Sequence, residues 1–430
     1  MMSRLKTAML ATLSVIWLIP WMLPHTVWSL PVASCISWLG ANDIPSRPYL
    51  VGVTVVTAVI LFIYYRISIN PPGSVALLIC ISILVLDHLA VAWTTSSPLV
   101  MSNCVRFVTG WAIGAVVVAV CARRLVVVGV VVSALGAVQA VYALALFRLG
   151  INMMTSGTVD RAGGTFNQPD VLSLWLAVAL PIGILLLIHE KVTWRVISLS
   201  LIVGLTFSAL LLTWNRADVA AEGVGLLFVI LRVFPDLLWR TRIAITLALI
   251  LGVVFIWHVR SSGPVNVASS GRSDAGRIGL WGQSAHIIAT NPIFGYGLGA
   301  LELPVLIKSH NTVAVAVFIQ PKNLYLYWLA ELGLMGAVLG TATIVLVIKA
   351  LRSSAAQAEN IGLSAAWIVI LVTGLADTTF GPSRPVAGNV IFGILTGATL
   401  FLPLQRLQNS RPISELPSNE HRTELLQSPG

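Results

Sequence analysis

Three short polar segments carry cationic side chains, and two of them lie where long apolar segments begin or end. Arg216 lies in "TWNRAD", Arg277 in "GRIGLW" and Lys322 in "PKN". A guanidinium group stays charged and donates hydrogen bonds in a planar fork that matches the oxygens of a phosphate. Cations of this kind, supplied by separate segments, predict a binding site for an anionic ligand.

The elements that must position these cations are set by the composition. Of the 430 residues, 57% are hydrophobic and only 10% are charged. A soluble protein carries about 25% charged residues. A deficit of this size along the whole chain excludes an ordinary soluble protein and predicts an all-α integral membrane protein.

Continuously apolar runs of about 17–25 residues, the length that crosses a bilayer as helix, recur along the chain. Because they do not alternate between polar and apolar residues, helices are predicted and a barrel is not. The twelve predicted spans are 7–29, 48–65, 74–95, 105–122, 125–147, 171–188, 192–213, 217–233, 240–258, 324–348, 360–379 and 388–404.

The orientation follows from lysine and arginine, which favour cytoplasmic loops. With the N-terminus inside, 15 of the 26 basic residues fall on the cytoplasmic side, and every inner loop has at least one. Both termini are therefore predicted to be cytoplasmic, with 405–430 a disordered tail. The net charge of +10 fits this topology and contact with anionic membrane lipids, and nothing in the sequence indicates nucleic-acid binding.

The other eleven basic residues are predicted at the outer face. Large translocated loops ignore the charge rule, so each of these can also be a solvated surface group. That alternative fits less well for Arg216 and Arg384, which lie in short turns. The eleven are Arg47, Arg106, Arg148, Arg161, Arg216, Arg260, Arg272, Arg277, Lys308, Lys322 and Arg384.

Two predicted outer segments are long enough to carry function. The first, 148–170, is polar and rich in turn residues. The second, 259–323, contains Ile278, Trp281, Ala285 and Ile288, spaced as one face of a short amphipathic helix. Such a helix would lie flat on the bilayer with Trp281 at the level of the headgroups.

The order of the outer motifs resembles one family. "RAGGTFNQPD" precedes a helix and is followed by "TWNRAD", "GRIGLW", "NPIFGYGLG" and "PKNLYLYWLAELGLMG". Over roughly residues 150–348 this is similar to the O-antigen ligase and polymerase superfamily of bacterial polysaccharide assembly. The resemblance implies a membrane glycosyltransferase fold (GT-C-like) in the bacterial inner membrane. It divides the chain into N-terminal helices (1–147), a ligase-like core (148–404) and the tail.

The resemblance also implies an activity. Enzymes of this family move a glycan from undecaprenyl diphosphate to an acceptor sugar at the periplasmic face, inverting the anomeric centre, with no metal and no cofactor. The acceptor is the lipid A-core for a ligase and a growing glycan for a polymerase.

Site residues are carried over by position. Arg216 and Arg277 match arginines that bind the donor diphosphate, and Arg161 and Asn167 are weaker candidates for the same polar mouth. Asn323 and Glu331 are expected to support the site, and Glu331 is expected to be structural, since an unpaired carboxylate in lipid is costly.

Lys322 departs from the family, because ligases carry a histidine at that position. An ordinary lysine cannot accept a proton at neutral pH, whereas a histidine can. Three accounts stay open: Lys322 is a base activated by neighbouring cations, Lys322 is a third phosphate clamp, or His310 in "KSHNT" takes the histidine's role.

The same departure leaves ligase and repeat-unit polymerase as alternatives, with a ligase-like enzyme favoured by the outer motifs. A secondary transporter is the alternative of another class, since Asp87 and His88 lie inside a predicted span. A transporter should show two related halves, and none is seen in the sequence.

Replacing either diphosphate arginine tests the carried-over roles. We expect Arg216→Ala and Arg277→Ala each to abolish glycan transfer, because the charge on the leaving diphosphate would lose its stabilising cation. Transfer is measured by lipopolysaccharide gels, and immunoblots of the membrane fraction check that each variant is made. Unchanged transfer in either variant would remove the diphosphate role of that residue.

Overall fold

The computed structural model describes a helical core and the segments around it. The described residues are 107, 110–111, 114, 117–118, 125–150, 153–156, 159–166, 169–236, 238–241, 243–244, 246–248, 251–252, 267–293, 295, 304–309, 312–317, 321–353, 358–379 and 386–409.

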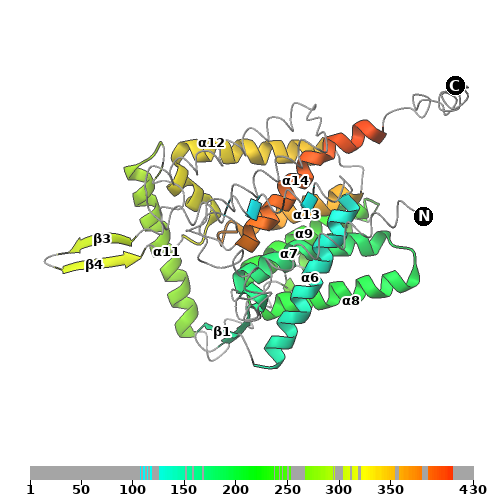
Figure 1. Cartoon of the computed structure of the whole chain (residues 1–430), viewed down its shortest axis with the longest axis horizontal. Coiled ribbons are helices and arrows are strands. Elements are labelled where there is room, and N and C mark those ends of the chain that lie inside the picture. Colours follow the sequence, from blue (N-terminus) through cyan, green and yellow to red (C-terminus); the bar gives the residue numbers. More distant parts are fainter. Residues whose placement is uncertain are drawn as a thin grey trace, which may run out of the picture.

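Helix α7 (Pro169–His189) is the centre of the bundle. It packs against α6 (Leu125–Arg148), α8 (Thr193–Leu212), α9 (Arg216–Val233) and α13 (Ala358–Thr373) (Figure 1). Its residues from Val171 through Pro181 are all buried. A helix that is apolar on every face is stable only when neighbours surround it, which explains its central position.

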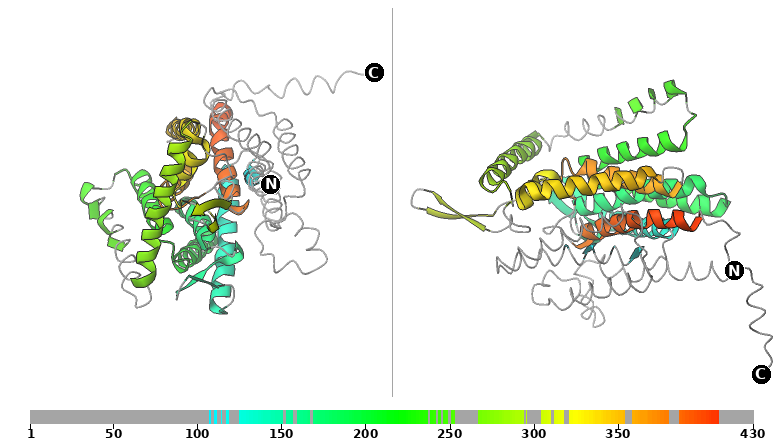
Figure 2. Two further views of the ribbon diagram at one scale, coloured as in Figure 1. Left: turned by 90° about the vertical axis from the view of Figure 1, so that its left-hand side faces the viewer. Right: turned by 90° about the horizontal axis from the view of Figure 1, so that it is seen from above.

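Two more helices complete the packing. Helix α14 (Val386–Asn409) contacts α12, α13 and α7, and α12 (Leu324–Ser353) lies along the bundle. Helix α11 (Val267–Thr290) runs across one end of the bundle and contacts α12 (Figures 1 and 2).

The described helices confirm the prediction of a helical, multi-pass membrane protein, but not the number of its spans. Three are long and apolar enough to cross a bilayer, namely Val126–Arg148, Pro169–His189 and Thr193–Leu212. Shorter apolar helices occupy Leu324–Leu334, Gly336–Lys349, Asn360–Thr373 and Gly388–Thr399. The predicted spans 7–29, 48–65 and 74–95 lie outside the described residues, and 105–122 and 240–258 are described only in part. Twelve spans therefore stay a prediction.

Helix α8 shows the surface expected of a lipid-facing helix. Trp194, Ile197 and Leu201 are each more than 60% exposed and recur at helical spacing along one side. Exposed apolar side chains in such a row are stable in hydrocarbon and costly in water. We infer that α8 lies at the lipid boundary of the bundle.

The α7–α8 turn is closed by Glu190. Its carboxylate accepts hydrogen bonds from the backbone N–H groups of Lys191 (3.0 Å) and Val192 (3.1 Å), and from Arg195 Nη1 (3.4 Å). The bond from Val192, with those from Lys191 and Arg195, holds the pKa of Glu190 below its ordinary value. The turn therefore links two antiparallel helices through three residues.

The structure contains strands that the all-α prediction missed. Strands β1 (Met153–Ser156) and β2 (Val159–Ala162) form an antiparallel hairpin inside the predicted polar loop 148–170. A second hairpin, β3 (Pro304–Ser309) and β4 (Thr312–Val317), projects away from the helices (Figures 1 and 2). Both are too short to show as membrane-length patterns in the sequence.

The helix predicted around Trp281 is confirmed, and its predicted apolar face packs only in part. Ile288 of that face and its neighbour Ile287 contact Tyr327 and Ala330 of α12, and Ser284 is buried one turn before them. At the other end of the predicted face, Ile278 is 66% exposed. The later part of α11 therefore docks onto α12, and the earlier part of the apolar face does not.

Helix α12 is broken where one continuous span was predicted. Gly333 has φ 61° and ψ −153°, a conformation that in practice only glycine adopts. The backbone N–H of Leu334, the next residue, donates to the carbonyl of Pro292 at 2.8 Å. The turn after α11 therefore packs into the break, and the sequence pattern alone does not show this contact.

Substitution of Gly333 tests the break. We expect Gly333→Ala to lower the free energy of unfolding by about 1–3 kcal/mol, from the disfavoured φ. An added Cβ would also lie 2.5 Å from the backbone N of Gly295. Thermal unfolding of the detergent-solubilised protein measures the effect.

Gly204 in α8 provides the matched control, because among the described residues no atom outside its chain neighbours and its own helix backbone lies within 4 Å of its Cβ position. Gly204→Ala should leave stability unchanged or raise it, since alanine favours helix. Equal stability of the two variants would contradict a glycine requirement at 333.

Candidate functional site

The candidate site lies at one end of the bundle, where three helices begin. Helix α9 begins after Asn215, whose Oδ1 accepts from the N–H of Ala217 at 3.2 Å. Helix α12 begins after Asn323, whose Oδ1 accepts from the N–H groups of Tyr325 and Leu326, each at 3.0 Å. Helix α7 begins close by. Helix N-termini carry partial positive charge, so their convergence favours an anionic ligand.

Four charged side chains join the elements at this end. Asp170, in the first turn of α7, pairs with Arg161 Nη2 at 2.8 Å and with Lys322 Nζ at 3.2 Å. Lys322 also pairs with Asp377 Oδ1 at 3.4 Å. Arg161 Nε donates to the carbonyl of Thr213 at 2.8 Å. Charged side chains thus hold together the hairpin β1–β2, the end of α8, the starts of α7 and α12, and the turn after α13.

Two turns at the site have unusual backbone conformations. Among the described residues, the non-glycine residues with positive φ are Trp214 (54°) and Lys322 (52°). Such conformations cost of order 1–3 kcal/mol and persist only where surrounding contacts enforce them. Trp214 belongs to "TWNRAD" and Lys322 to "PKN", so both strained residues fall in motifs that the sequence marked as functional.

The turn that carries Lys322 is fixed on two sides. The backbone N–H of Leu324 donates to the carbonyl of Gly374 at 2.8 Å, and Asn323 Nδ2 donates to the carbonyl of Leu375 at 2.8 Å. On its other side, the indole N–H of Trp281 donates to the carbonyl of Pro321 at 2.8 Å. Both α11 and the end of α13 therefore position this turn.

Arg277 is carried toward the same turn by α11. It precedes Trp281 by four residues, so the two share one side of the helix. The bond from Trp281 to Pro321 holds that side against the turn. Arg277 is half-buried, as is Arg216, the first residue of α9.

A buried polar cluster supports the start of α9. Asp218 is fully buried, and its Oδ2 accepts from the hydroxyl of Ser173 and from Asn215 Nδ2, the latter at 2.7 Å. Asn215 Nδ2 also lies 2.9 Å from Ser173 Oγ. These bonds fix the turn before Arg216 against α7.

Glu331 lies deeper than the ionic cluster. It is fully buried in α12, two residues before the break at Gly333. This position agrees with the structural role expected for it.

An apolar groove begins beside the polar end. It runs along α12 from Leu324 through Trp328 to Ile344, with Leu371 of α13 and Phe392 of α14 in its other walls. Its first residue, Leu324, directly follows Asn323, so the groove starts where the charged cluster ends.

Comparison with known proteins agrees with the motifs. Residues 201–341 match the family model described as O-antigen ligase. The chain carries a domain of the O-antigen ligase superfamily. The predicted resemblance is confirmed, and the match falls within the 150–348 over which it was expected. No curated protein matches the chain.

The segment that matches the O-antigen ligase model contains some of the predicted site residues and their charged partners, but not all of them. Arg216, Arg277, Lys322, Asn323 and Glu331 lie inside it. The side chains that pair with Lys322, from Asp170 and Asp377, lie outside it, as does Arg161.

The structure describes most of the predicted site residues. It brings Arg161 and Lys322 together through Asp170, and it puts Arg216 three residues after Thr213, to which Arg161 is bonded. Asn167, His310 and Arg384 lie outside the described residues. The strands that flank His310 extend away from the bundle (Figure 1).

Sequence reasoning missed the two acids of the cluster. Asp170 ends the motif "RAGGTFNQPD" and opens a helix, where acidic residues are favoured by the helix dipole. Asp377 falls inside the predicted span 360–379, but α13 ends at Thr373 and Asp377 lies in the turn after it. An acid near the end of an apolar run was the signal that this helix ends early.

Removing Lys322 tests the ionic cluster. We expect Lys322→Met to lower the free energy of unfolding by about 1–2 kcal/mol, because Asp170 and Asp377 would lose their shared cation. The cost is below that of a fully buried pair because the Lys322 side chain is 29% exposed.

A double-mutant cycle with Asp377→Asn should then show a coupling of at least about 0.5 kcal/mol, measured by thermal unfolding. Arg195→Gln is the control, since the Arg195–Glu190 pair is more exposed and should be worth less. A Lys322 effect no larger than the Arg195 effect would contradict the bridging role.

Proposed function

We propose that the chain is a membrane glycosyltransferase that moves a glycan from undecaprenyl diphosphate to an acceptor sugar. The observation that carries the proposal is that one end of the bundle, where helices begin and charged side chains gather, lies beside an apolar groove. A polyprenyl diphosphate is an amphiphile with the same two parts. Its diphosphate suits the cations, and its isoprenoid tail suits the groove between α12, α13 and α14.

The cations fit the charge that the reaction develops. When the bond between sugar C1 and the diphosphate oxygen breaks, the leaving diphosphate gains negative charge. Guanidinium groups and helix N-termini that are already fixed stabilise this charge without reorganising. In this proposal Arg216, Arg277 and Arg161 hold the diphosphate.

The contacts of Lys322 support the account in which it is a phosphate clamp. The side chain already pairs with oxygen anions of Asp170 and Asp377. Diphosphate oxygens offer the same charge and similar geometry, so they can replace one of these partners.

The proton of the acceptor then needs another destination. As the acceptor hydroxyl oxygen forms its bond to C1 and the diphosphate leaves, the hydroxyl proton passes to the carboxylate of Asp170 or Asp377. Both carboxylates lie within 3.4 Å of Lys322 Nζ. The account with His310 as base stays an alternative.

Two acceptors are candidates. Transfer to the lipid A-core would make the chain an O-antigen ligase, at the periplasmic face of the bacterial inner membrane. Transfer to a growing glycan would make it a repeat-unit polymerase. Lysine in place of the ligase histidine at position 322 is the observation that favours the polymerase.

Deletion of the gene in its host tests the function and separates the two. For a ligase, polymer should accumulate on undecaprenyl diphosphate and never reach the lipid A-core. For a polymerase, the core should be capped by a single repeat with no ladder. Gels of the lipopolysaccharide beside the lipid-linked pool show either outcome, and an unchanged pattern in both pools would overturn the proposal.

Complementation of the same strain tests His310 as the proton acceptor. If Lys322 is a clamp and the aspartates take the proton, His310→Ala should restore the wild-type pattern, whereas Lys322→Ala should not. Loss of function in His310→Ala with normal protein levels would return the role to the histidine.

A further inference from the structure

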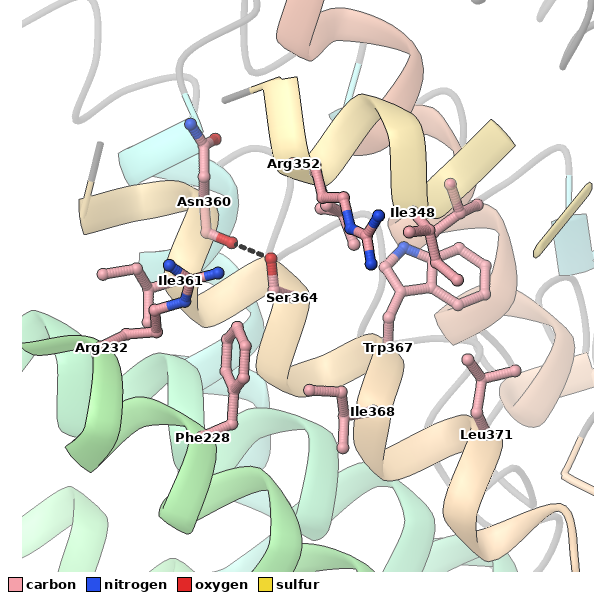
Figure 3. Close-up of a pocket in the computed structure, with 12 residues that line it drawn as sticks. Phe228, Arg232, Ile348, Arg352, Asn360, Ile361, Ser364, Trp367, Ile368 and Leu371 are labelled. Carbon is pink, nitrogen blue, oxygen red and sulfur yellow. Dashed lines mark hydrogen bonds between the residues drawn. The ribbon is translucent and has the colours of Figure 1, made fainter. Parts of the chain in front are cut away.

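A second groove lies at the opposite end of the bundle. It is bounded by the later turns of α9 and α12 and by α13 from Asn360 to Leu371. Apart from Trp367 and Leu371, which also line the groove beside the charged end, its lining residues have no role in the proposed glycan transfer. Figure 3 shows its lining, with Arg232 and Arg352 at two of its edges.

The lining changes from polar to apolar along α13. Asn360 and Ser364 lie toward the start of the helix, where the hydroxyl of Ser364 donates to the carbonyl of Asn360 at 2.6 Å. Ile368 and Leu371 lie further along the same helix, toward the middle of the bundle (Figure 3). The groove is therefore amphiphilic along its length.

Two cations border its polar part. Arg232 lies in the last turn of α9 and Arg352 in the last turn of α12, and both side chains are exposed. The guanidinium carbon of Arg232 lies 5.7 Å from the ring centroid of Phe228, which also lines the groove. A basic residue in the last turn of a helix is common, because it complements the helix dipole. That reason does not explain why two helices direct such residues into one groove.

The start of α13 adds to the positive character. A helix N-terminus carries partial positive charge, and the groove borders the first turn of α13 at Asn360. Two guanidinium groups and one helix start thus face the same polar space. An anion is the complementary ligand.

We propose that this groove binds an anionic phospholipid of the adjoining leaflet. Its phosphate would lie between Arg232 and Arg352, and one acyl chain would run over Trp367, Ile368 and Leu371. A free phosphate would leave the apolar part of the groove unfilled, and a neutral lipid would leave the two arginines without a counter-charge. Basic grooves between membrane helices are suited to such headgroups.

The groove shares two walls with the proposed donor groove. Trp367 and Leu371 line both of them. The indole N–H of Trp367 donates to the hydroxyl of Thr399 at 2.9 Å, which fixes the ring between the two. An acyl chain bound in this groove would pack against Trp367 and Leu371 and so stabilise the packing of α13 beside α12, on the side away from the proposed donor.

Native mass spectrometry of the full-length protein, released from detergent, tests the proposal. Phosphatidylglycerol is titrated against phosphatidylcholine with the same acyl chains, for the wild type and for Arg232→Gln, Arg352→Gln and the double variant. Arg240→Gln is the matched control, because Arg240 also lies over an aromatic ring, Trp239, at 5.9 Å, but does not line the groove.

We expect tighter retention of phosphatidylglycerol than of phosphatidylcholine by the wild type. Each single variant should weaken phosphatidylglycerol binding about fivefold, and the double variant about thirtyfold. Arg240→Gln should bind as the wild type does. Arg352→Lys should lose less than Arg352→Gln, because it keeps the charge and loses only the planar fork.

Other outcomes would overturn the proposal. Equal retention of the two lipids, or a double variant that binds as tightly as Arg240→Gln, would mean that the groove does not select anionic lipid. Displacement of the lipid by glycerol 3-phosphate, which has no acyl chain, would mean a soluble phosphate site. The activity of the enzyme is not needed for any of these readouts.

Discussion

The ammonium group of Lys322 connects parts of the chain that are far apart in sequence. It bridges Asp170 at the start of α7 and Asp377 in the turn after α13, and it stands at the start of α12. Arg161 extends the same cluster to the first hairpin and to the end of α8. At the end of a membrane bundle, charges that are partly removed from water need partners, so these pairs fix which helix ends can meet.

The positive φ of Lys322 follows from this constraint. Asn323 caps α12 while the Leu324 N–H and the Asn323 side chain bond to the end of α13. Trp281 holds the turn from the other side. These contacts offset the free-energy cost of the positive φ at Lys322. They also fix the direction in which the Lys322 side chain leaves the backbone.

The two ends of the bundle share a physical design. At each end, cations and at least one helix start lie beside apolar surface, and the two grooves meet at Trp367 and Leu371. Charged groups are costly within hydrocarbon, so helix ends are where a membrane protein most readily combines charge with an apolar wall. The site proposed for the donor and the site proposed for a phospholipid are two uses of that combination.

The sequence by itself determined the membrane class, the positions of the described apolar helices and the motifs that contain Arg161, Arg216, Arg277 and Lys322. These depend on local properties, namely continuous hydrophobicity and turn residues between helices, which are written along the chain. It also supported the family, because the order of motifs is itself a sequence property.

Only the tertiary structure decided the pairing of Lys322 with two acids, the break at Gly333 and the face by which α11 docks. Each depends on a contact between distant segments. In the sequence Asp377 falls within an apolar run, and only the structure shows that α13 ends before it. Gly333 reads as an ordinary helix glycine until Pro292 is bonded to the residue after it. On α11 the partner helix, not the pattern, decides that Ile288 of the apolar face packs while Ile278 stays exposed.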